Sequence, residues 1–592
     1  MKELQYPFDS RYILKKRKSI KRTLLESQTS FLEKKIAVLG GSTTHDICEI
    51  MDLFLLNQGI KASFYECEYA QYWEDIMFEA PELKEFAPDI IYIHTSNRNI
   101  RKYPMLAQSE QDVEQMIQAD YEHFQTMWQK IETTWHCSVI QNNFDYPSYR
   151  LMGNRDAVDV HGKVCYVNRL NTLFSQYARE HQDFYLHDLN YLSASYGLEK
   201  WADPLYWHMY KYALCMEAIP TLAFSVTNMI KSVYGKNKKA LALDLDNTLW
   251  GGIVGDDGVD RLEIGEETSL GQVYGEFQNY IKEQKSIGTI LTICSKNEHE
   301  NALAGLNHPD APLKPDDFIV IKANWEPKSQ NLMEMAAEIN LLPEAFVFVD
   351  DNPAEREIIS QQVPGVIAPE IGSVENYIQV LDKSGFFEVT NFSADDATRN
   401  QMYQDNAKRQ QMQQSFDHYD EYLQSLDMKA VIRSFEPIYM ERIAQLTNKS
   451  NQFNLTTKRY TGAEIEAVAT SASHIDLYGK LEDKFGDNGV VSVVIGEIKG
   501  DTLHIDLWIM SCRVLKRDME YAMLDQLTAQ CSKKGITRIK GYYYPTAKNK
   551  MVQNFYELQG FTKVKEDKEG NTEWEFVIKP SYENKNKWIQ VL

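Results

Sequence analysis

The sequence predicts a multidomain α/β protein: two successive parallel-sheet domains, then a final α+β domain. Its 592 residues are enough for three or four domains at roughly 150 residues each. Up to residue 390, short apolar runs alternate with helical patterns, which is typical of parallel sheets covered by helices on both faces. After residue 429, three long strand patterns precede the next helix, which favours antiparallel pairing.

Changes in pattern along the chain predict where one segment ends and the next begins. No internal repeat is present, which excludes a solenoid. We expect a basic arm at 1–35, an α/β domain at 36–235, a second α/β domain at 236–390, a polar helical linker or bridging helix at 391–428, and an α+β domain at 429–592.

The composition excludes several classes of protein. The chain has 63 basic and 85 acidic residues, a net charge of −22, which argues against a nucleic-acid partner. No apolar run reaches the roughly 18 residues that a membrane span needs, and no apolar stretch near the start predicts a signal peptide. Eight cysteines without a CxxC pair indicate reduced thiols and no structural zinc site. We therefore expect a cytoplasmic protein with no membrane span.

One short segment departs from this acidity. Residues 15–22 read KKRKSIKR, with six basic residues in eight positions. Such a run is either a solvated helix face or a docking patch for an acidic partner, such as a carrier protein or an anionic membrane surface. The sequence leaves both interpretations open.

The first α/β domain places a serine where a strand turns into a helix. Its expected strands are KKIAVLG, IKASFYE, PDIIYIHTS, CSVIQN and DFYLHDL, with helices that include 112–134 and 168–181. Ser42 follows the first strand in IAVLGGSTTHD, and backbone N–H groups at such a turn can cradle an anion or form an oxyanion hole.

This segment resembles the first block of SGNH-type hydrolases, which implies a flavodoxin/SGNH-like parallel sheet. Asn142 or Asn143 would match a later block, and Asp203 with His208 the last one. Two features depart from that pattern: Gly41 stands where those hydrolases usually have Asp, and Asp203 and His208 are five residues apart rather than three. The domain is therefore either a hydrolase using Ser42 and His208 or a fold kept for docking a carrier or substrate.

The second α/β domain has strands that read as continuous apolar runs, as fully buried parallel strands do. They are KALALDLD, GTILTICS, DFIVIKA and AFVFVDD, with helices at about 269–285, 329–340 and 354–362. Because ligands bind at the carboxyl ends of parallel strands, polar residues at these ends predict a site. These residues are Asp244, Asp246, Ser295, Lys328 at the start of a helix, Asp350 and Asp351.

Together they resemble the four motifs of the HAD superfamily, and DLDNTLWGG, CSKN and FVFVDDNPAERE resemble its FkbH-like branch (subfamily IIIC). Asp244 would be the nucleophile that forms an aspartyl-phosphate. Asp246 would protonate the leaving oxygen and then take a proton from water. Ser295 and Lys328 would hold the phosphoryl oxygens and balance their charge.

A magnesium ion fits this set of residues. Mg²⁺ prefers a few hard oxygen ligands. We expect these from Asp244, from the main-chain carbonyl of Asp246, and from Asp350 or Asp351, between which the sequence does not decide.

The spacing of these motifs predicts a capless, Rossmannoid domain. Asp244 and Ser295 are 51 residues apart, and Ser295 and Lys328 are 33 apart, so neither gap has room for a folded cap. An open site suits a substrate attached to something large, such as a protein-bound thioester.

The final domain predicts a helix at 437–449, strands at 475–485, 489–498 and 502–511, a helix at 517–532, the strand TRIKGYYY and a helix near 548–558. This order resembles the GNAT fold. Its pyrophosphate loop would lie at 512–520, where Lys516, Arg517 and Asp518 replace glycines and put ordinary CoA binding in doubt.

Candidate residues follow from this resemblance. Arg513, Lys516, Arg517 and Asn549 would contact the cofactor or phosphopantetheine arm. Tyr556 would donate a proton; ordinary helix polarity and packing explain Asn549 and Tyr556 equally well. Cys512 lies among three basic residues that would lower its thiol pKa, so it is either an acyl-carrying nucleophile or a structural cysteine. Cys294 is expected in the core, because strand alternation points it away from Ser295.

The FkbH-like resemblance implies an activity. Such proteins load a glyceryl unit from 1,3-bisphosphoglycerate onto the phosphopantetheine arm of an acyl carrier protein, and the HAD domain dephosphorylates an enzyme-bound phosphoglyceryl thioester. The expected cofactor is Mg²⁺, and the expected partners are the carrier protein and a small phosphorylated acyl substrate. Two alternatives remain: a phosphatase of another phosphoester in polysaccharide or secondary-metabolite biosynthesis, and a scaffold that only binds a carrier protein.

Overall fold

The computed structural model describes residues 1–27, 31–413, 415–450, 452–546 and 548–592. The chain divides into two compact units, which are described separately: residues 1–231 with 461–464, and residues 232–460 with 465–592. None of the helices in these ranges has the length and apolarity needed to cross a bilayer.

The first unit is built on a parallel sheet with the strand order β2-β1-β3-β4-β5. The order places β1 and β3 at the centre and is that of flavodoxin-like folds, as expected. The strands are β1 (Leu32–Gly40), β2 (Ile60–Glu66), β3 (Ile90–His94), β4 (Ser138–Asn142) and β5 (Phe184–His187).

Helices pack on both faces of this sheet. On one face Trp128 of α5 and Phe174 of α6 lie 4.7 Å apart between ring centres and contribute to a core shared with the strands. Phe54 of α2 and Phe224 of α10 form another aromatic contact, at 5.1 Å. The helices are α1 (Ser10–Ser27), α2 (His45–Asn57), α3 (Tyr72–Met77), α4 (Pro81–Phe86), α5 (Glu110–Trp135), α6 (Lys163–Glu180), α7 (Leu189–Tyr196), α8 (Leu198–Trp201), α9 (Pro204–Tyr210) and α10 (Ile219–Val233).

The second unit begins with another parallel sheet, in the order β8-β7-β6-β9. Its strands are β6 (Ala240–Leu243), β7 (Ile290–Ser295), β8 (Val320–Ala323) and β9 (Phe346–Val349). Every residue of β6, β7 and β9 is buried, which explains their continuous apolar sequence. All the strands run in one direction, so their carboxyl ends meet at one edge of the sheet.

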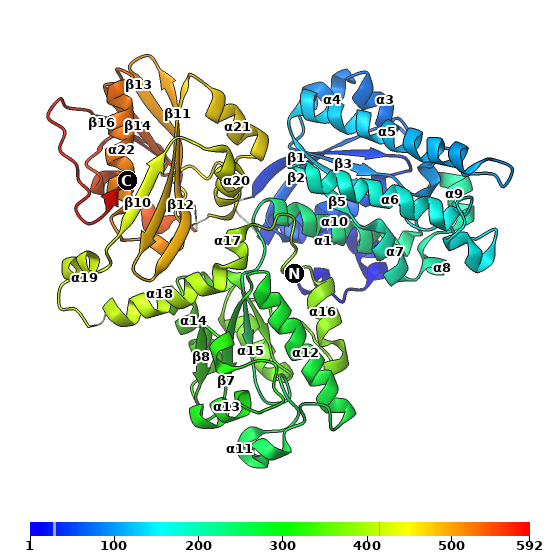
Figure 1. The fold of residues 1–592 in the computed structure, drawn as a ribbon, viewed down its shortest axis with the longest axis horizontal. Coiled ribbons are helices and arrows are strands. Elements are labelled where there is room, and N and C mark those ends of the chain that lie inside the picture. The colour runs from blue at the N-terminus through cyan, green and yellow to red at the C-terminus, as the bar shows by residue number, and fades with distance from the viewer. Residues whose placement is uncertain (28–30, 414, 451, 547) are drawn as a thin grey trace. The chain divides into compact units, whose positions relative to one another are not determined.

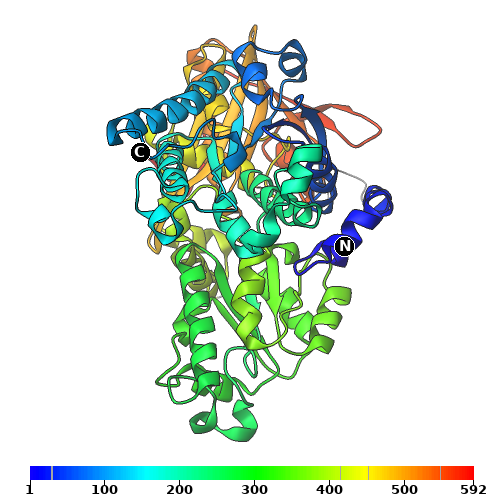
Figure 2. The same ribbon diagram turned by 90° about the vertical axis from the view of Figure 1, so that its right-hand side faces the viewer.

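Helices lie on both sides of this sheet (Figures 1 and 2). They are α11 (Val254–Asp257), α12 (Ser269–Ser286), α13 (His299–Leu306), α14 (Lys328–Glu338), α15 (Pro353–Gln362) and α16 (Tyr377–Lys383). The stretch from Asp244 to Lys328, which the structure describes throughout, contains short helices, α12 and two strands, but no inserted cap domain.

The polar segment after this sheet forms α17 (Ala394–Ala397), α18 (Arg399–Gln413) and α19 (Tyr419–Ser425). Asn400 of α18 donates to the carbonyl of Lys285 at 2.9 Å, on the parallel-sheet side. Further along α18, Arg409 pairs with Asp483 of the C-terminal sheet at 2.7 Å. Helix α18 therefore bridges the two halves of the second unit.

The C-terminal sheet is mixed, in the order β15-β16-β14-β13-β12-β11-β10-β17. Neighbours are antiparallel except β13 with β14 and β10 with β17. The three strands β11, β12 and β13 precede α22, β14 and α23, which is the expected order. The bounds are β10 (Lys429–Arg433), α20 (Met440–Lys449), α21 (Gly462–Thr470), β11 (His474–Asp483), β12 (Gly486–Lys499), β13 (Thr502–Met510), α22 (Met519–Lys533), β14 (Arg538–Tyr543), α23 (Phe555–Leu558), β15 (Thr562–Glu566), β16 (Thr572–Val577) and β17 (Gln590–Val591).

Strands β13 and β14 pair only over their first three residues. Beyond that point residues 453–455 lie between them. Met510 of β13 donates its N–H to the carbonyl of Phe453, and Leu455 donates to the carbonyl of Trp508. On the other side, Tyr544 donates to the carbonyl of Leu455 at 2.9 Å. This segment continues the hydrogen bonding of the sheet where the two strands separate.

Candidate functional site

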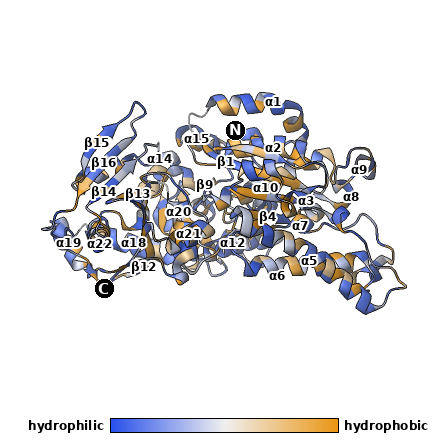
Figure 3. Cartoon of the chain, turned by 90° about the horizontal axis from the view of Figure 1, so that it is seen from above, coloured by the Kyte–Doolittle hydropathy of each residue, from blue (hydrophilic) through white to orange (hydrophobic). Residues whose placement is uncertain are grey.

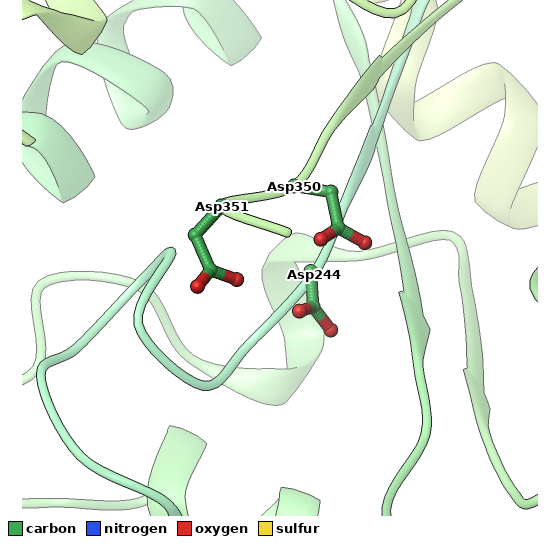
Figure 4. Close-up of side chains that lie close together, drawn as sticks. All are labelled: Asp244, Asp350 and Asp351. Carbon is green, nitrogen blue, oxygen red and sulfur yellow. The ribbon is translucent and has the colours of Figure 1, made fainter. Parts of the chain in front are cut away.

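Three carboxylates meet at the carboxyl edge of the second parallel sheet. Asp244 follows β6, and Asp350 and Asp351 follow the neighbouring strand β9. One oxygen from each lies within 4.8 Å of the others, and Figure 4 shows the three side chains gathered together. Asp244 and Asp350 are buried, and Asp351 is half-buried. The predicted pairing of these motifs is therefore present as a real cluster.

Lys328 is the cation in this cluster. It is the first residue of α14, and its Nζ lies 3.0 Å from Asp244 Oδ1 and 2.6 Å from Asp350 Oδ2. Burial alone would lower its pKa, but the two carboxylates more than compensate and raise it, so the side chain stays charged.

The cluster still has more negative than positive charge. Burial, followed by the charge of Asp244, raises the pKa of Asp350 to about 6 despite the opposing effect of Lys328. The same two causes raise the pKa of Asp351. Carboxylates that resist ionisation in this way gain stability from an added cation.

Asp246 is held apart from the cluster by its own donors. Its Oδ1 accepts from Trp250 Nε1 at 3.0 Å and from the N–H of Val254 at 3.0 Å, and its Oδ2 accepts from Asn297 Nδ2 at 2.8 Å. Burial nevertheless raises its pKa. The carboxyl group is thus fixed in position and is easily protonated, as a general acid requires.

Two further residues position the loop after β9 and were missed by the sequence analysis. Arg356 Nη1 donates to the carbonyls of Asp350 at 2.7 Å and Asp351 at 2.8 Å. Thr248 Oγ1 accepts the N–H of Asp351 at 3.1 Å. Arg356 belongs to the quoted motif FVFVDDNPAERE, so an arginine one turn into the helix after two aspartates was the available signal.

Ser295 ends β7, next to β6, and is buried at the same edge of the sheet. Its contact with a phosphoryl group stays a prediction. Cys294 lies in the core on the other face, as expected, and burial raises the pKa of its thiol.

In the first unit, Ser42 and His208 do not form the expected relay. Ser42 Oγ is buried and has no hydrogen-bond partner in the described part of the chain. His208 is exposed on α9, and Asp203 instead caps that helix by accepting from the N–H of Leu205. His208 is thus exposed while Ser42 is buried, and a hydrolase role for the two residues stays a prediction.

Asn142 is instead the centre of a buried polar network. Its Nδ2 donates to His94 Nδ1 at 2.9 Å, and its Oδ1 lies 2.9 Å from His187 Nδ1. His187 Nε2 continues the network to Ser225 Oγ at 2.9 Å. Burial lowers the pKa of His94 to about 3 and of His187 to about 4, so both rings are neutral. Asn143 bonds separately to Asp188.

The basic loop before α22 is already occupied by the chain's own groups. Arg517 is buried against Asp483 at 3.1 Å and Asn406 at 2.7 Å, and Arg513 is buried against the sulfur of Met402. Residues of α18 contact both guanidinium groups in this structure, and the cofactor role of the two arginines stays a prediction.

Lys516 is exposed, with φ +64, and Asp518 has φ +63, so this loop has the left-handed backbone that favours glycine although it lacks glycine. The N–H of Lys516 donates to Glu520 Oε1 at 3.2 Å, which places a carboxylate where an anion would bind. Cys512 begins the short helix before this loop, and its side chain lies outside the described part of the structure.

Asn549 and Tyr556 are both buried. Asn549 is completely buried and donates to the carbonyls of Asn454 and Tyr544, both at 2.9 Å, so its amide holds residues 453–455 in place. Tyr556 is 1% exposed within the C-terminal core, and its hydroxyl has no partner among the described residues. Burial of both side chains agrees with a packing role, and their roles in cofactor binding and proton donation stay predictions.

One family of known proteins matches the first part of the chain. Residues 35–231 match the family described as FkbH, N-terminal domain. This part of the chain is therefore similar to FkbH N-terminal domains. No curated protein gives a significant match to the chain.

A solved structure extends the similarity beyond the FkbH N-terminal domain. It is the N-terminal part of a protein from Bacteroides fragilis, containing a phosphatase domain complexed with Mg. The two share 28% identity with a TM-score of 0.58, over 64% of this chain and 99% of that one.

Other solved structures are similar to the C-terminal part of the chain. An acetyltransferase of the GNAT family from Streptococcus pneumoniae shares 15% identity, with a TM-score of 0.22, over 26% of this chain and 100% of that one. The GNAT domain of a protein from S. lividans shares 16% identity, with a TM-score of 0.21, over 25% of this chain and 89% of that one.

Proposed function

We propose that this chain is a Mg²⁺-dependent phosphatase of the HAD type that removes phosphate from a small phosphorylated acyl group and helps to load that acyl group onto an acyl carrier protein. The observation that supports the chemistry best is the cluster of Asp244, Asp350 and Asp351 around Lys328 at the open edge of a parallel sheet. The relative with a phosphatase domain and bound Mg supports the same proposal.

The donors in the cluster fit Mg²⁺. They are carboxylate oxygens, which this cation prefers. Burial, followed by the charge of Asp244, raises the pKa values of Asp350 and Asp351, and a bound cation would favour their ionised forms. Asp244 would hold the ion with Asp350 or Asp351, and the main-chain carbonyl of Asp246 stays a further candidate. When bound, the ion would neutralise negative charge on the phosphoryl oxygens.

Asp244 is the nucleophile in this proposal. One oxygen of its carboxylate forms a bond to phosphorus while the bond from phosphorus to the ester oxygen of the substrate breaks. Lys328 would offset the negative charge of the incoming phosphoryl group at Asp244, since its Nζ is only 3.0 Å from Asp244 Oδ1. Ser295, at the end of the adjacent strand, would donate to a phosphoryl oxygen.

Asp246 supplies and removes the protons. Its carboxyl group protonates the departing ester oxygen, and the resulting carboxylate then takes a proton from the water that attacks the aspartyl-phosphate. This second attack breaks the bond between Asp244 and phosphorus and releases inorganic phosphate. Trp250 and Asn297 keep the carboxyl in place through both steps.

The acyl-transfer part of the proposal has different support. The match of residues 35–231 to the FkbH N-terminal domain supports it, because carrier loading is what the FkbH-like resemblance implies. The uncapped stretch from Asp244 to Lys328 also suits a substrate tethered to a protein. Cys512 remains the candidate for the thiol that holds the acyl group.

The phosphatase proposal is tested with Asp244→Asn. We expect Mg²⁺-dependent phosphate release from a small phosphoester to fall by about 10³-fold or more, because the amide cannot act as the nucleophile. Glu338→Gln, which alters an exposed ion pair with Lys322 in the same domain, serves as the control and should keep its activity. Substantial activity in a folded Asp244→Asn protein would refute the mechanism.

The transfer proposal is tested by mass spectrometry after incubation with a carrier protein and 1,3-bisphosphoglycerate. A glyceryl adduct on the carrier supports the proposal, and Cys512→Ser should remove the adduct while sparing hydrolysis of the small phosphoester. Release of phosphate with no adduct would leave only the phosphatase. A stable complex without any chemistry would favour the scaffold alternative.

A further inference from the structure

Helix α1, Ser10–Ser27, contains the basic run that the proposed function does not use. Its apolar residues Ile13, Ile20 and Leu24 are buried, and the helix packs on α2. Figure 3 shows hydrophilic and hydrophobic segments alternating along the helix, as an amphipathic helix requires. One face of α1 is therefore fixed to the first unit, and the other is turned away from it.

Part of the basic charge is used in the contact with α2. Arg17 pairs with Glu49 at 2.9 Å, and Lys21 pairs with Asp52 at 2.7 Å. These ion pairs lie beside the buried apolar stripe and account for two of the six basic residues in the run. Together with the buried apolar residues, these ion pairs fix which side of α1 faces α2 and which side faces solvent.

The outward-facing charges are not neutralised. Lys15, Lys18 and Arg22 follow the spacing i, i+3 and i+7, which places them on one side of a helix. All are exposed, and within the described residues none makes an ion pair or side-chain hydrogen bond. Tyr12 and Leu25, each 41% exposed, lie one turn before and one turn after them. We call these five residues the α1 basic face.

We propose that the α1 basic face is the docking surface for an acidic protein, namely the carrier protein that the proposed function requires. The inference rests on that function for the identity of the partner and on charge complementarity for the surface. A chain with a net charge of −22 repels an acidic protein at long range, so productive approach depends on a local cationic surface. The exposed rings and methyl groups of Tyr12 and Leu25 add apolar contact at both ends of the charged stripe.

The structure favours a protein over an anionic membrane as the occupant. An amphipathic helix that lies on a bilayer inserts its apolar face among the lipids. In α1 that face, formed by Ile13, Ile20 and Leu24, is already buried within the unit. What remains exposed is the α1 basic face, which carries three cationic residues, and one acidic residue, Glu26, which lies one turn after Arg22. The net charge of this side is positive, with an apolar residue at each end, and this suits a matching acidic surface.

The α1 basic face is tested by charge reversal in the full chain. The variant Lys15→Glu/Lys18→Glu/Arg22→Glu is compared with Lys102→Glu/Lys200→Glu/Lys568→Glu, which makes the same change in net charge at exposed lysines elsewhere. Binding of an acidic acyl carrier protein is measured by calorimetry from about 50 to about 500 mM salt. Phosphate release from a small phosphoester reports on the catalytic site.

We expect the first variant to lose about tenfold or more in affinity and to raise the KM for carrier protein similarly. Phosphate release should stay within about twofold, and the control variant should resemble the wild type. If the first variant is poorly folded, Lys18→Ala/Arg22→Ala replaces it and should lose less affinity in the same direction.

The outcomes separate this inference from the proposed function. Salt-dependent binding that is lost only in the first variant, without any acyl transfer, supports the docking surface and refutes carrier loading. Transfer with an unchanged KM in the first variant, or equal losses in both variants, overturns the docking surface. Absence of binding by the wild type overturns it too, as does tighter binding to vesicles of anionic phospholipid than to carrier protein.

Discussion

At Lys328 a single ammonium group offsets the charge of a buried carboxylate cluster. Its Nζ contacts Asp244 and Asp350, while Asp351 lies close by and makes no ion pair within the described part of the chain. Removing one member of a buried ion pair is costly because the remaining charges lose their compensation. The lysine and a bound cation therefore share the task of stabilising this site.

We predict that Lys328→Met lowers the free energy of unfolding by about 3–5 kcal/mol in Mg²⁺-free buffer. Added Mg²⁺ should then recover more stability in the variant than in the wild type, since more negative charge is left for it to neutralise. Denaturant unfolding with and without Mg²⁺ measures both effects. Lys322→Met, which breaks ion pairs with the exposed Glu334 and Glu338, should cost less than about 1 kcal/mol. Equal losses in the two variants would contradict the prediction.

The buried histidines of the first unit predict a loss of stability in acid. Burial lowers the pKa of His94 to about 3 and of His187 to about 4, whereas the unfolded chain titrates near 6.5. Between pH 6.5 and 4 the unfolded state therefore binds more protons, and stability falls as the pH falls, by about 1.4 kcal/mol per pH unit for each ring. Urea unfolding from pH 4.5 to 7 measures the slope. His187→Gln should reduce it, and the exposed His208→Gln should not.

At the scale of elements, helix α13 packs closely against Trp250, the residue that positions the proposed general acid Asp246. A Cβ added to Gly305 of α13 would lie 2.7 Å from Cη2 of Trp250, whose indole N–H donates to Asp246. The glycine is therefore required by close approach and not by its backbone angles. The position of Asp246 depends on a helix that contains no predicted catalytic residue.

We predict that Gly305→Ala lowers kcat for phosphate release by about tenfold, because the displaced indole shifts Asp246 from its working position. KM should change less, since the nucleophile and Lys328 are untouched. Gly275→Ala in α12 is the matched control: nothing lies within 4 Å of the added Cβ, so activity should be kept and stability should rise by about 0.5–1 kcal/mol. A normal kcat in the Gly305 variant would contradict the prediction, because it would show that the position of Trp250 does not affect catalysis by Asp246.

The elements also show how far the sequence could predict the fold. Continuous apolar runs such as β6 and β9 were recognisable because burial on both faces demands them, and the polar residues at their ends predicted the cluster. Asn297 donates to the Asp246 carboxylate and Arg356 to main-chain carbonyls. Only the folded chain brings these groups together, so the motifs contained both residues without revealing what they bind. The loop before α22 shows a related limit of sequence analysis. Its basic sequence does not reveal that Arg517 is paired with Asp483 in the folded chain.

At the scale of the whole molecule, α18 connects the parallel-sheet half of the second unit to the loop expected to bind a cofactor. Asn406 and Arg409 of α18 join Arg517 and Asp483 in one buried network. Burial, followed by the charge of Arg409, lowers the pKa of Arg517 to about 10. The positive charge of Arg517, which could bind a pyrophosphate, therefore takes part instead in the contact between α18 and the C-terminal sheet.

We predict that the full chain does not bind acetyl-CoA with micromolar affinity. Arg513 and Arg517 are buried in internal contacts, and Glu520 accepts the loop N–H of Lys516, so little of the loop is free to hold a pyrophosphate. Calorimetric titration of the intact protein measures this. Binding of about −8 kcal/mol, equivalent to a micromolar Kd, would refute the prediction and indicate an independent acetyltransferase.

The segment at 453–455 has a consequence for how the protein can be divided or shortened. Without it, the separated halves of β13 and β14 would each expose a row of unpaired main-chain groups, and such open strand edges recruit strands from other molecules. Deleting the connection between α20 and α21 to shorten the chain should therefore produce self-association, even though no predicted catalytic residue is removed. Any fragment intended to stay monodisperse needs to retain these three residues together with Asn549, whose side chain fastens them.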